Sequence, residues 1–177
     1  MPVTVLTGPV ASGKSRLAAR LASTWAGPVV VIATAEALDD EMRERIERHR
    51  RERPDAWTVH EVPVDLAEAI GAMPPEAFAI VDCLTVWTSN LMGAAVAHDD
   101  IVERAGTAAR KAADRSSPVV VVSNEVGWGI VPMNDMAREY RDLLGAVNRA
   151  FVEVSDRAAV VIAGSVVPLA RAEEMFP

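Results

Sequence analysis

Short apolar runs alternate along the chain with longer segments in which apolar residues recur every three or four positions. The runs have the length of β-strands, and most are apolar throughout, which is typical of strands covered by helices on both faces. They predict strands at residues 3–7, 28–33, 57–62, 77–81, 119–123 and 159–163.

The longer segments between these runs predict helices. They lie at residues 14–25, 38–53, 65–72, 99–114 and 134–157. In the last segment Met136, Tyr140, Leu143, Val147 and Phe151 form one stripe at helical spacing. Strand–helix alternation of this kind predicts an α/β fold with a doubly wound, mostly parallel sheet. Neither a repeat nor a linker interrupts the pattern, so we expect residues 1–177 to form a single domain.

Composition narrows the class of protein. The 177 residues are enough to bury a core without a disulfide. The chain carries 18 basic and 25 acidic residues, a net charge of −7, which argues against a nucleic-acid partner. The single cysteine predicts a reducing compartment. No export signal begins the chain and no apolar run has membrane-spanning length, so we expect a cytoplasmic location and no membrane partner.

A phosphate-binding loop lies between the first predicted strand and the first predicted helix. It fits the pattern G-x-x-x-x-G-K-[ST] at every fixed position, as Gly8-Pro9-Val10-Ala11-Ser12-Gly13-Lys14-Ser15. Backbone N–H groups of such a loop and the N-terminus of the following helix bind phosphate oxygens. Lys14 is expected to reach the β- and γ-phosphates, and the Ser15 hydroxyl to ligate Mg²⁺. The alternative is a glycine turn that matches by chance, but the flanking strand and helix favour nucleoside triphosphate binding.

Two carboxylates follow predicted strands. Asp82 comes directly after the apolar run 78–81, where a Walker-B carboxylate would hold Mg²⁺. Glu125 follows the run 119–124 and would face the same ligand crevice, as a second-site carboxylate, unless it caps a turn or helix. Lys14 and Lys111 are the only lysines, so the guanine-reading Asn-Lys-x-Asp loop of switch GTPases is absent. A small kinase or a nucleotidyltransferase remains.

Six arginines lie between positions 43 and 53, interleaved with glutamates, which is typical of a solvated helix. His49 lies among them. Arg45 and Arg53 are four residues to either side of it and would share its helix face. Their positive charge would favour the neutral, nucleophilic imidazole, and they could hold a triphosphate against it. A surface histidine with no role is the alternative interpretation.

Two blocks are more specific than the phosphate loop: Arg45-Ile46 with His49 and Arg53-Pro54, and Asn124-Glu125-Val126-Gly127. With them the sequence resembles the bifunctional adenosylcobinamide kinase / adenosylcobinamide-phosphate guanylyltransferases of cobalamin synthesis. Further matches are the phosphate loop, Ile32-Ala33-Thr34-Ala35, Asp39-Asp40-Glu41-Met42, Trp57, Glu61, Val81-Asp82-Cys83-Leu84-Thr85-Val86-Trp87, Asn90-Leu91, Trp128-Gly129-Ile130-Val131-Pro132, Arg138, Arg141-Asp142, Gly145 and Asn148.

The resemblance implies a RecA-like P-loop fold and a homotrimer with two activities. One activity phosphorylates the aminopropanol hydroxyl of adenosylcobinamide, a corrinoid, from ATP or GTP. The other transfers GMP from GTP to the resulting phosphate through a guanylyl-histidine, giving adenosyl-GDP-cobinamide. His49 falls on the guanylylated histidine of the family. Positions resembling its guanine-nucleotide contacts are Ala33, Thr34, Ala35, Arg50, Arg51, Glu52, Arg53, Glu61 and Asp82.

The phosphate loop departs from the family at two positions. The family loop often reads Gly-Gly-x-Arg-Ser-Gly-Lys-Ser, whereas here Pro9 replaces the second glycine and Ala11 the arginine. Pro9 has no backbone N–H, so the loop has one donor fewer.

Two other functions remain as alternatives: a small-molecule or nucleoside-monophosphate kinase with no covalent step, and a nucleotide-binding regulatory module. Neither of these needs a histidine nucleophile.

Overall fold

One seven-stranded sheet organises the chain. The computed structural model describes residues 3–37 and 39–175, apart from the side chains of Glu41 and Arg45. Its strands are β1 (Val3–Thr7), β2 (Val29–Ala33), β3 (Thr58–Glu61), β4 (Phe78–Asp82), β5 (Val119–Val122), β6 (Arg157–Ile162) and β7 (Ser165–Leu169). They lie in the order β3-β2-β4-β5-β1-β6-β7, and every neighbouring pair is parallel except β6 and β7. The predicted α/β fold with a mostly parallel sheet is confirmed.

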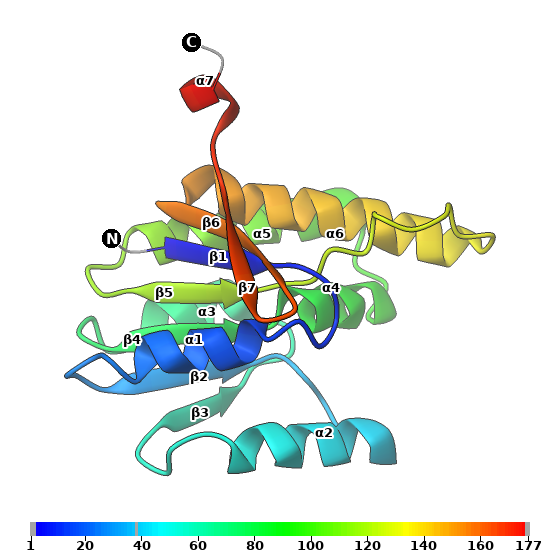
Figure 1. The fold of residues 1–177 in the computed structure, drawn as a ribbon. Helices are drawn as coiled ribbons and strands as arrows, with labels where there is room; N and C mark the ends of the chain where they lie inside the picture. Colours follow the sequence, from blue (N-terminus) through cyan, green and yellow to red (C-terminus); the bar gives the residue numbers. More distant parts are fainter. Residues whose placement is uncertain (1–2, 38, 176–177) are drawn as a thin grey trace.

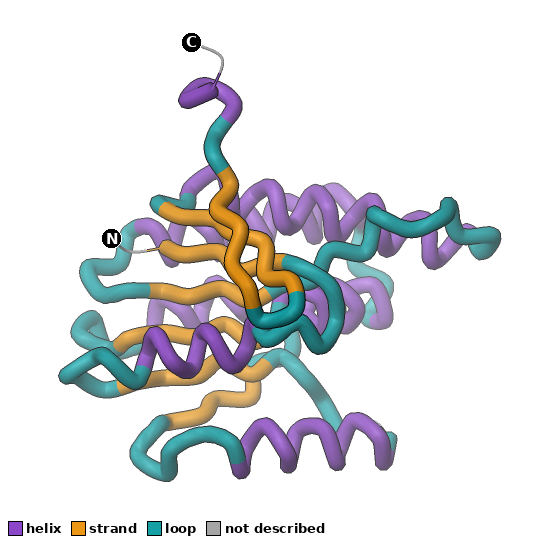
Figure 2. Tube along the Cα trace, viewed as in Figure 1, coloured by secondary structure: helices purple, strands orange, loops and turns teal. Residues whose placement is uncertain are grey.

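Helices cover both faces of this sheet (Figure 1). They are α1 (Lys14–Ala22), α2 (Asp40–Arg51), α3 (Leu66–Ala72), α4 (Leu84–Gly93), α5 (His98–Ala113), α6 (Asp135–Val154) and α7 (Ala172–Met175). Helix α1 lies on one face, and α3, α4, α5 and α6 lie on the other (Figures 1 and 2). Helix α2 lies beside β3, the strand at one edge of the sheet (Figure 1). From this position its last turn brings His49 to Asp82 at the end of β4.

Alternate residues of each central strand serve two separate cores, which explains why the strands are apolar throughout. Val119 and Val121 of β5 pack into the core beneath α3 to α6, whereas Val120 and Val122 pack against α1. All four are buried, and full burial of a valine side chain stabilises the fold by roughly 1.5–3 kcal/mol.

Three elements of the structure were not predicted, namely α4, β7 and the single-turn helix α7. In α4 the buried residues Leu84, Trp87 and Leu91 have helical spacing, but Val86 and Met92 outside this face are also apolar, so the sequence shows little contrast between the faces of the helix. Strand β7 forms an antiparallel hairpin with β6 through Ala163 and Gly164, whose φ angles are 49° and 78°. Two successive positive φ angles are typical of the tight turn that suits a hairpin. The predicted strand 159–163 therefore ends one residue too late, and the predicted helix 38–53 begins at Asp40, with Leu38 outside the described residues.

In the part of the chain that the structure describes, no helix is both long and apolar enough to span a membrane.

Candidate active site

The phosphate loop joins β1 to α1 in a conformation that depends on glycine. Gly8 has a φ of 135°, and a Cβ atom added there would lie 2.3 Å from the carbonyl oxygen of Val161 on β6. Gly13 has a φ of 100° and immediately precedes α1. The hairpin turn supports the loop from outside, since the N–H of Gly164 donates to the carbonyl of Ser12 (2.9 Å). The close packing of Gly8 on β6 and the hydrogen bond from Gly164 to Ser12 thus fix the conformation of the loop.

Lys14 is buried beneath this loop, with only 5% of its surface exposed. Its Nζ donates to the carbonyls of Gly8 (3.0 Å) and Pro9 (2.6 Å) and to Oγ of Ser12 (3.3 Å). The ammonium group therefore lies inside the curl of the loop, where phosphate oxygens are expected. Pro9 cannot donate a backbone hydrogen bond, but its carbonyl helps to hold Lys14 in place.

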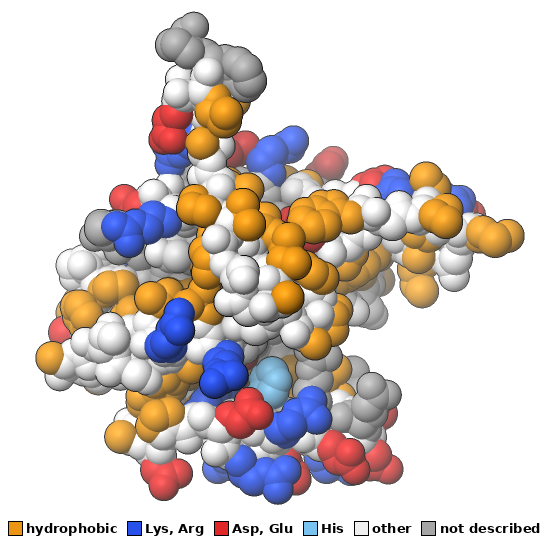
Figure 3. All heavy atoms as spheres, viewed as in Figure 1, with side chains coloured by type: hydrophobic (Ala, Val, Ile, Leu, Met, Phe, Trp, Pro, Cys, Tyr) orange, Lys and Arg blue, Asp and Glu red, His pale blue; other side chains and the backbone are white. Residues whose placement is uncertain are grey.

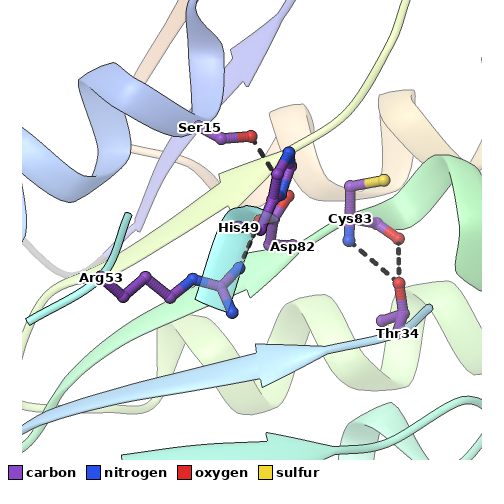
Figure 4. A network of polar contacts seen from close by, with 6 residues as sticks. All are labelled: Ser15, Thr34, His49, Arg53, Asp82 and Cys83. Carbon is purple, nitrogen blue, oxygen red and sulfur yellow. Dashed lines mark hydrogen bonds and ion pairs between the residues drawn. The ribbon is translucent and has the colours of Figure 1, made fainter. Parts of the chain in front are cut away.

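Asp82 ends β4 opposite the loop and connects three elements (Figure 4). Its carboxylate accepts hydrogen bonds from Oγ of Ser15 (3.3 Å) and Nη2 of Arg53 (2.8 Å), and Oδ2 lies 3.7 Å from Nδ1 of His49. Burial raises the pKa of Asp82, but the contact with His49 and the charge of Arg53 lower it by more, so that the net shift is downward. Asp82 is therefore held as a carboxylate.

His49 lies in the last turn of α2 and points towards Asp82 (Figure 4). The helix begins where the side chain of Asp39 accepts a hydrogen bond from the N–H of Met42 (2.7 Å). Arg53 lies beyond the end of α2, so it does not share the helix face of His49 as expected. Its guanidinium bonds Oδ2 of Asp82, the same oxygen that His49 faces, while the side chain of Arg45 falls outside the described part.

Three hollows meet around this pair, since each is lined by both His49 and Asp82. The first, about 350 Å³, is lined by residues 10–16 of the phosphate loop and α1. The second, about 410 Å³, lies between α1 and α2 and includes Trp57 in its wall. Charged side chains gather over this part of the surface (Figure 3). Together the hollows offer room for a nucleotide whose phosphates lie beside His49.

The third hollow, about 50 Å³, brings in the predicted end of β2 through Ala33 and Ala35. Thr34 between them is fully buried, and its hydroxyl bonds both the N–H (2.9 Å) and the carbonyl (2.7 Å) of Cys83. Thr34 therefore links the segment that follows β2 to the segment that follows β4. Burial raises the pKa of Cys83, and the charge of Asp82 raises it further, as expected for a packed thiol.

Other predicted nucleotide contacts lie further out. Arg50 and Arg51 are exposed on α2 and line none of the three hollows, whereas the exposed Glu52 lines two of them. Glu61 is exposed at the end of β3, in register with Ala33, and is likewise absent from all three linings.

Four residues that line the hollow at the phosphate loop were not predicted as site residues: Arg16, Cys83, Val122 and Asn124. Arg16 and Asn124 are the two whose side chains can form strong hydrogen bonds with a ligand. For both Arg16 and Asn124, the position in the sequence could have indicated a place in the site. Arg16 follows the Lys-Ser pair of the loop motif by one residue, and Asn124 follows a buried strand.

Glu125 lies across the loop from Asp82, one residue beyond Asn124. Its Oε1 accepts hydrogen bonds from Oγ1 of Thr7 (2.9 Å) and Nδ2 of Asn148 (3.1 Å). Its N–H donates to the carbonyl of Gly8 (3.1 Å). Glu125 is thus a fixed carboxylate beside the phosphate loop.

The donors at the predicted magnesium site are few. Among the described residues no group of three or more His, Cys, Asp or Glu side chains could hold a metal ion. The Ser15 hydroxyl and the Asp82 carboxylate, 3.3 Å apart, supply two oxygen donors. This small set fits Mg²⁺, which commonly takes one or two protein oxygens and completes its shell with phosphates and water.

Comparison with known proteins decides which P-loop family contains this site. Residues 4–169 match the model of the family described as CobU, cobinamide kinase / cobinamide phosphate guanyltransferase. The chain belongs to this family. Membership confirms the resemblance inferred from the sequence and the predicted enzyme class, a transferase with kinase and guanyltransferase chemistry.

Named relatives agree with the family match. The bifunctional adenosylcobalamin biosynthesis protein CobP of Pseudomonas aeruginosa is 38% identical and matches over 93% of this chain and 95% of its own length. The corresponding protein CobU of Salmonella typhimurium is 35% identical, over 90% of this chain and 95% of its own length.

Solved structures of low sequence identity share the fold. A Pyrococcus horikoshii OT3 protein has a TM-score of 0.57 at 9% identity and covers 97% of this chain and 88% of its own. The RadB recombinase has a TM-score of 0.51 at 15% identity and covers 89% of this chain and 73% of its own. These likenesses concern the fold, and they agree with the predicted RecA-like P-loop architecture.

Proposed function

We propose that this chain phosphorylates the aminopropanol hydroxyl of adenosylcobinamide and then transfers GMP from GTP to the resulting phosphate. The kinase step would take ATP or GTP. The family match and the names of the relatives support both activities. The observation that carries the guanylyl transfer is the position of His49, held towards Asp82 where three hollows meet the phosphate loop.

The contact with Asp82 supports His49 as the nucleophile. A carboxylate facing Nδ1 favours the tautomer that carries its proton on Nδ1, and leaves the lone pair of Nε2 available for attack. Nε2 would attack the α-phosphorus of GTP, the bond to the bridging oxygen would break, and pyrophosphate would leave. The imidazole then bears GMP on Nε2 and a proton on Nδ1. Asp82 would stabilise the positive charge that this creates.

The second half of the transfer restores the histidine. A phosphate oxygen of adenosylcobinamide phosphate would attack the same phosphorus, and the P–N bond would break with its electron pair returning to Nε2. Lys14, Arg16 and Arg53 surround the hollows and would balance the negative charge that develops on the phosphates. Mg²⁺, held by Ser15 and Asp82, would neutralise the phosphate oxygens when bound.

Residues further from His49 would select the guanine base of the nucleotide and the corrinoid acceptor. Glu61 offers a carboxylate that can accept hydrogen bonds from N1–H and the 2-amino group of guanine, while Glu52, Arg50 and Arg51 would contact the nucleotide from α2. The loop after Glu125 exposes Trp128 and Ile130, apolar side chains suited to a large corrinoid acceptor.

We further propose a cytoplasmic location and a homotrimeric assembly, both of which rest on sequence and family resemblance.

A product assay tests the function as a whole. The protein is incubated with adenosylcobinamide, GTP and Mg²⁺, and corrinoids are separated by chromatography and weighed by mass spectrometry. We expect adenosylcobinamide phosphate to appear first and adenosyl-GDP-cobinamide to follow. Formation of the phosphate alone would support a plain kinase and would contradict the guanylyl transfer. If neither product forms while GTP binds, both activities are contradicted.

A further inference from the structure

The two proposed activities make different demands on proton transfer, and this difference points to Glu125. In guanylyl transfer the nucleophiles are a neutral imidazole and an ionised phosphate, which need lose no proton on attack. In the kinase step the nucleophile is an alcohol, whose proton must leave as the new O–P bond forms. A general base is therefore required for the kinase step alone.

Among the carboxylates around the phosphate loop, three are poorly placed for that task. Asp82 is engaged by Ser15, Arg53 and His49, and its pKa is lowered, since the contact with His49 and the charge of Arg53 outweigh the effect of burial. Glu52 lies on α2 beside His49, on the side where guanylyl transfer would occur. Glu61 is two strands from Asp82, at the end of β3.

Glu125 differs from these in both position and support. Strand β5 lies between β4 and β1, so Glu125 emerges between Asp82 and the beginning of the phosphate loop. Its N–H and Nζ of Lys14 both donate to the carbonyl of Gly8, which ties the backbone of Glu125 to the lysine that reaches for phosphate. Glu125 itself lines none of the three hollows, but Asn124, the residue before it, lines the hollow at the phosphate loop, so an acceptor hydroxyl approaching a γ-phosphate from the side of β5 would meet this carboxylate first.

Hydrogen bonds also fix the orientation of the Glu125 side chain. Thr7 and Asn148 both donate to the same oxygen, Oε1, so the clamp fixes the carboxylate while Oε2 takes no part in it. Asn148 is itself fixed, because its Oδ1 accepts from Oγ of Ser123 (2.5 Å) and its Nδ2 donates to the carbonyl of Asn124 (3.0 Å). Such a supported side chain is typical of a functional group that must keep one geometry.

We propose that Glu125 is the general base of the kinase step, and that Thr7 and Asn148 are its positioning residues. Oε2 takes the proton of the acceptor hydroxyl as the alcohol oxygen bonds to the γ-phosphorus. The bond between that phosphorus and the β,γ-bridging oxygen breaks, and the nucleoside diphosphate leaves with the electron pair. The protonated carboxyl then releases its proton to water. This inference rests on the proposed kinase activity.

The test separates the two activities in one set of variants. Glu125→Gln keeps the shape of the side chain and can still accept from Thr7, but it has no basic oxygen. We expect its kinase turnover with adenosylcobinamide to fall by about 100-fold or more. Labelling of His49 by GTP, and GMP transfer to supplied adenosylcobinamide phosphate, should stay within about twofold of the unaltered protein. Glu153→Gln, an exposed carboxylate on α6, is the matched control and should retain both activities.

Thr7→Val tests the positioning role without touching the base. Loss of the hydroxyl should lower kinase turnover by about tenfold with little change in KM, and Glu125→Asp should recover part of the activity lost in Glu125→Gln. The residual kinase activity of Glu125→Gln should rise with pH, because hydroxide or an ionised alcohol then replaces the missing base.

Three results would overturn the proposal. They are kinase turnover in Glu125→Gln within threefold of the unaltered protein, an equal loss of kinase and labelling activities in that variant, and a fall in GTP affinity that accounts for the loss of turnover. If the unaltered protein itself shows no kinase activity, the proposed function fails instead, and the two failures are thereby distinguished.

Discussion

Nδ1 of His49 lies 3.7 Å from Oδ2 of Asp82, and this relationship brings the last turn of α2 over the carboxyl end of β4. The two residues are 28% and 11% exposed at their side chains, so the pair is accessible to a ligand from the histidine side. A single carboxylate is thereby connected both to the expected nucleophile and, through Ser15, to the phosphate loop.

Replacing Asp82 by Asn should slow guanylylation more than it weakens GTP binding. The amide cannot stabilise the positive imidazole ring that forms on attack, and it pairs less well with Arg53. We expect the rate of label transfer from GTP to the protein at saturating GTP to fall by at least about tenfold, or about 1.4 kcal/mol. Asp55→Asn, an exposed residue beyond α2, is the control. A normal rate in Asp82→Asn would contradict the role of the pair.

The same substitution should change how stability depends on pH. Because the folded-state pKa of Asp82 lies below its ordinary value of 3.8, the unfolded chain binds the proton more tightly, and the charged side chain stabilises the fold above that pH. This contribution disappears as pH falls through the folded-state pKa. Urea unfolding from about pH 6 to about pH 3 should therefore show a steeper loss of stability in the unaltered protein than in Asp82→Asn. Parallel curves would show that Asp82 makes no such contribution.

Lys14→Met should abolish most nucleotide binding while the fold persists. Nζ of Lys14 lies inside the phosphate loop, so the variant loses the charge that meets the phosphates. We expect the Kd for GTP, measured by calorimetry, to rise by at least about 30-fold, or about 2 kcal/mol. Lys111→Met, at the only other lysine of the chain, is the matched control on the exposed surface of α5. Equal affinity in the two variants would contradict the assignment.

Gly8→Ala should destabilise the protein, because the new Cβ would meet the carbonyl of Val161 and the backbone has a φ of 135°. We expect the free energy of unfolding to fall by about 2 kcal/mol or more. Gly93→Ala serves as control, since nothing lies within 4 Å of a Cβ at that helical position and alanine favours helices. If chemical denaturation gives the two variants the same stability, the loop is not held as described.

The sheet was predictable because its strands and helices obey local rules. Runs such as 119–122 are apolar on both faces, and the stripe on α6 has helical spacing, so neither needs tertiary information. Helix α4 was missed because apolar residues such as Val86 and Met92 also lie outside its buried face, so the pattern of apolar and polar positions is weak. Strand β7 was missed because all of its residues are exposed and it contains Pro168, so no buried pattern marks it.

The site was predictable in its parts and not in its assembly. The loop motif identified Lys14 and Ser15, and the strand end identified Asp82. The contact of His49 with Asp82, however, depends on where α2 lies beside the edge of the sheet, and 33 positions of sequence separate the two residues. Arginine spacing around His49 indicated a positive environment, but it gave no sign that Arg53 and His49 would face the same oxygen of Asp82. The clamp of Thr7 and Asn148 on Glu125 joins three distant segments and has no local signal.

The most direct test of the central claim is to incubate the protein with Mg²⁺ and GTP labelled at the α-phosphate, denature it, and measure label on the chain. The chain contains three histidines, so the controls are complete with two variants. We predict acid-labile, base-stable label that persists in His60→Ala and His98→Ala and disappears in His49→Ala. Absence of label from the unaltered protein despite GTP binding, or its survival in His49→Ala, would contradict a guanylyl-histidine at this site.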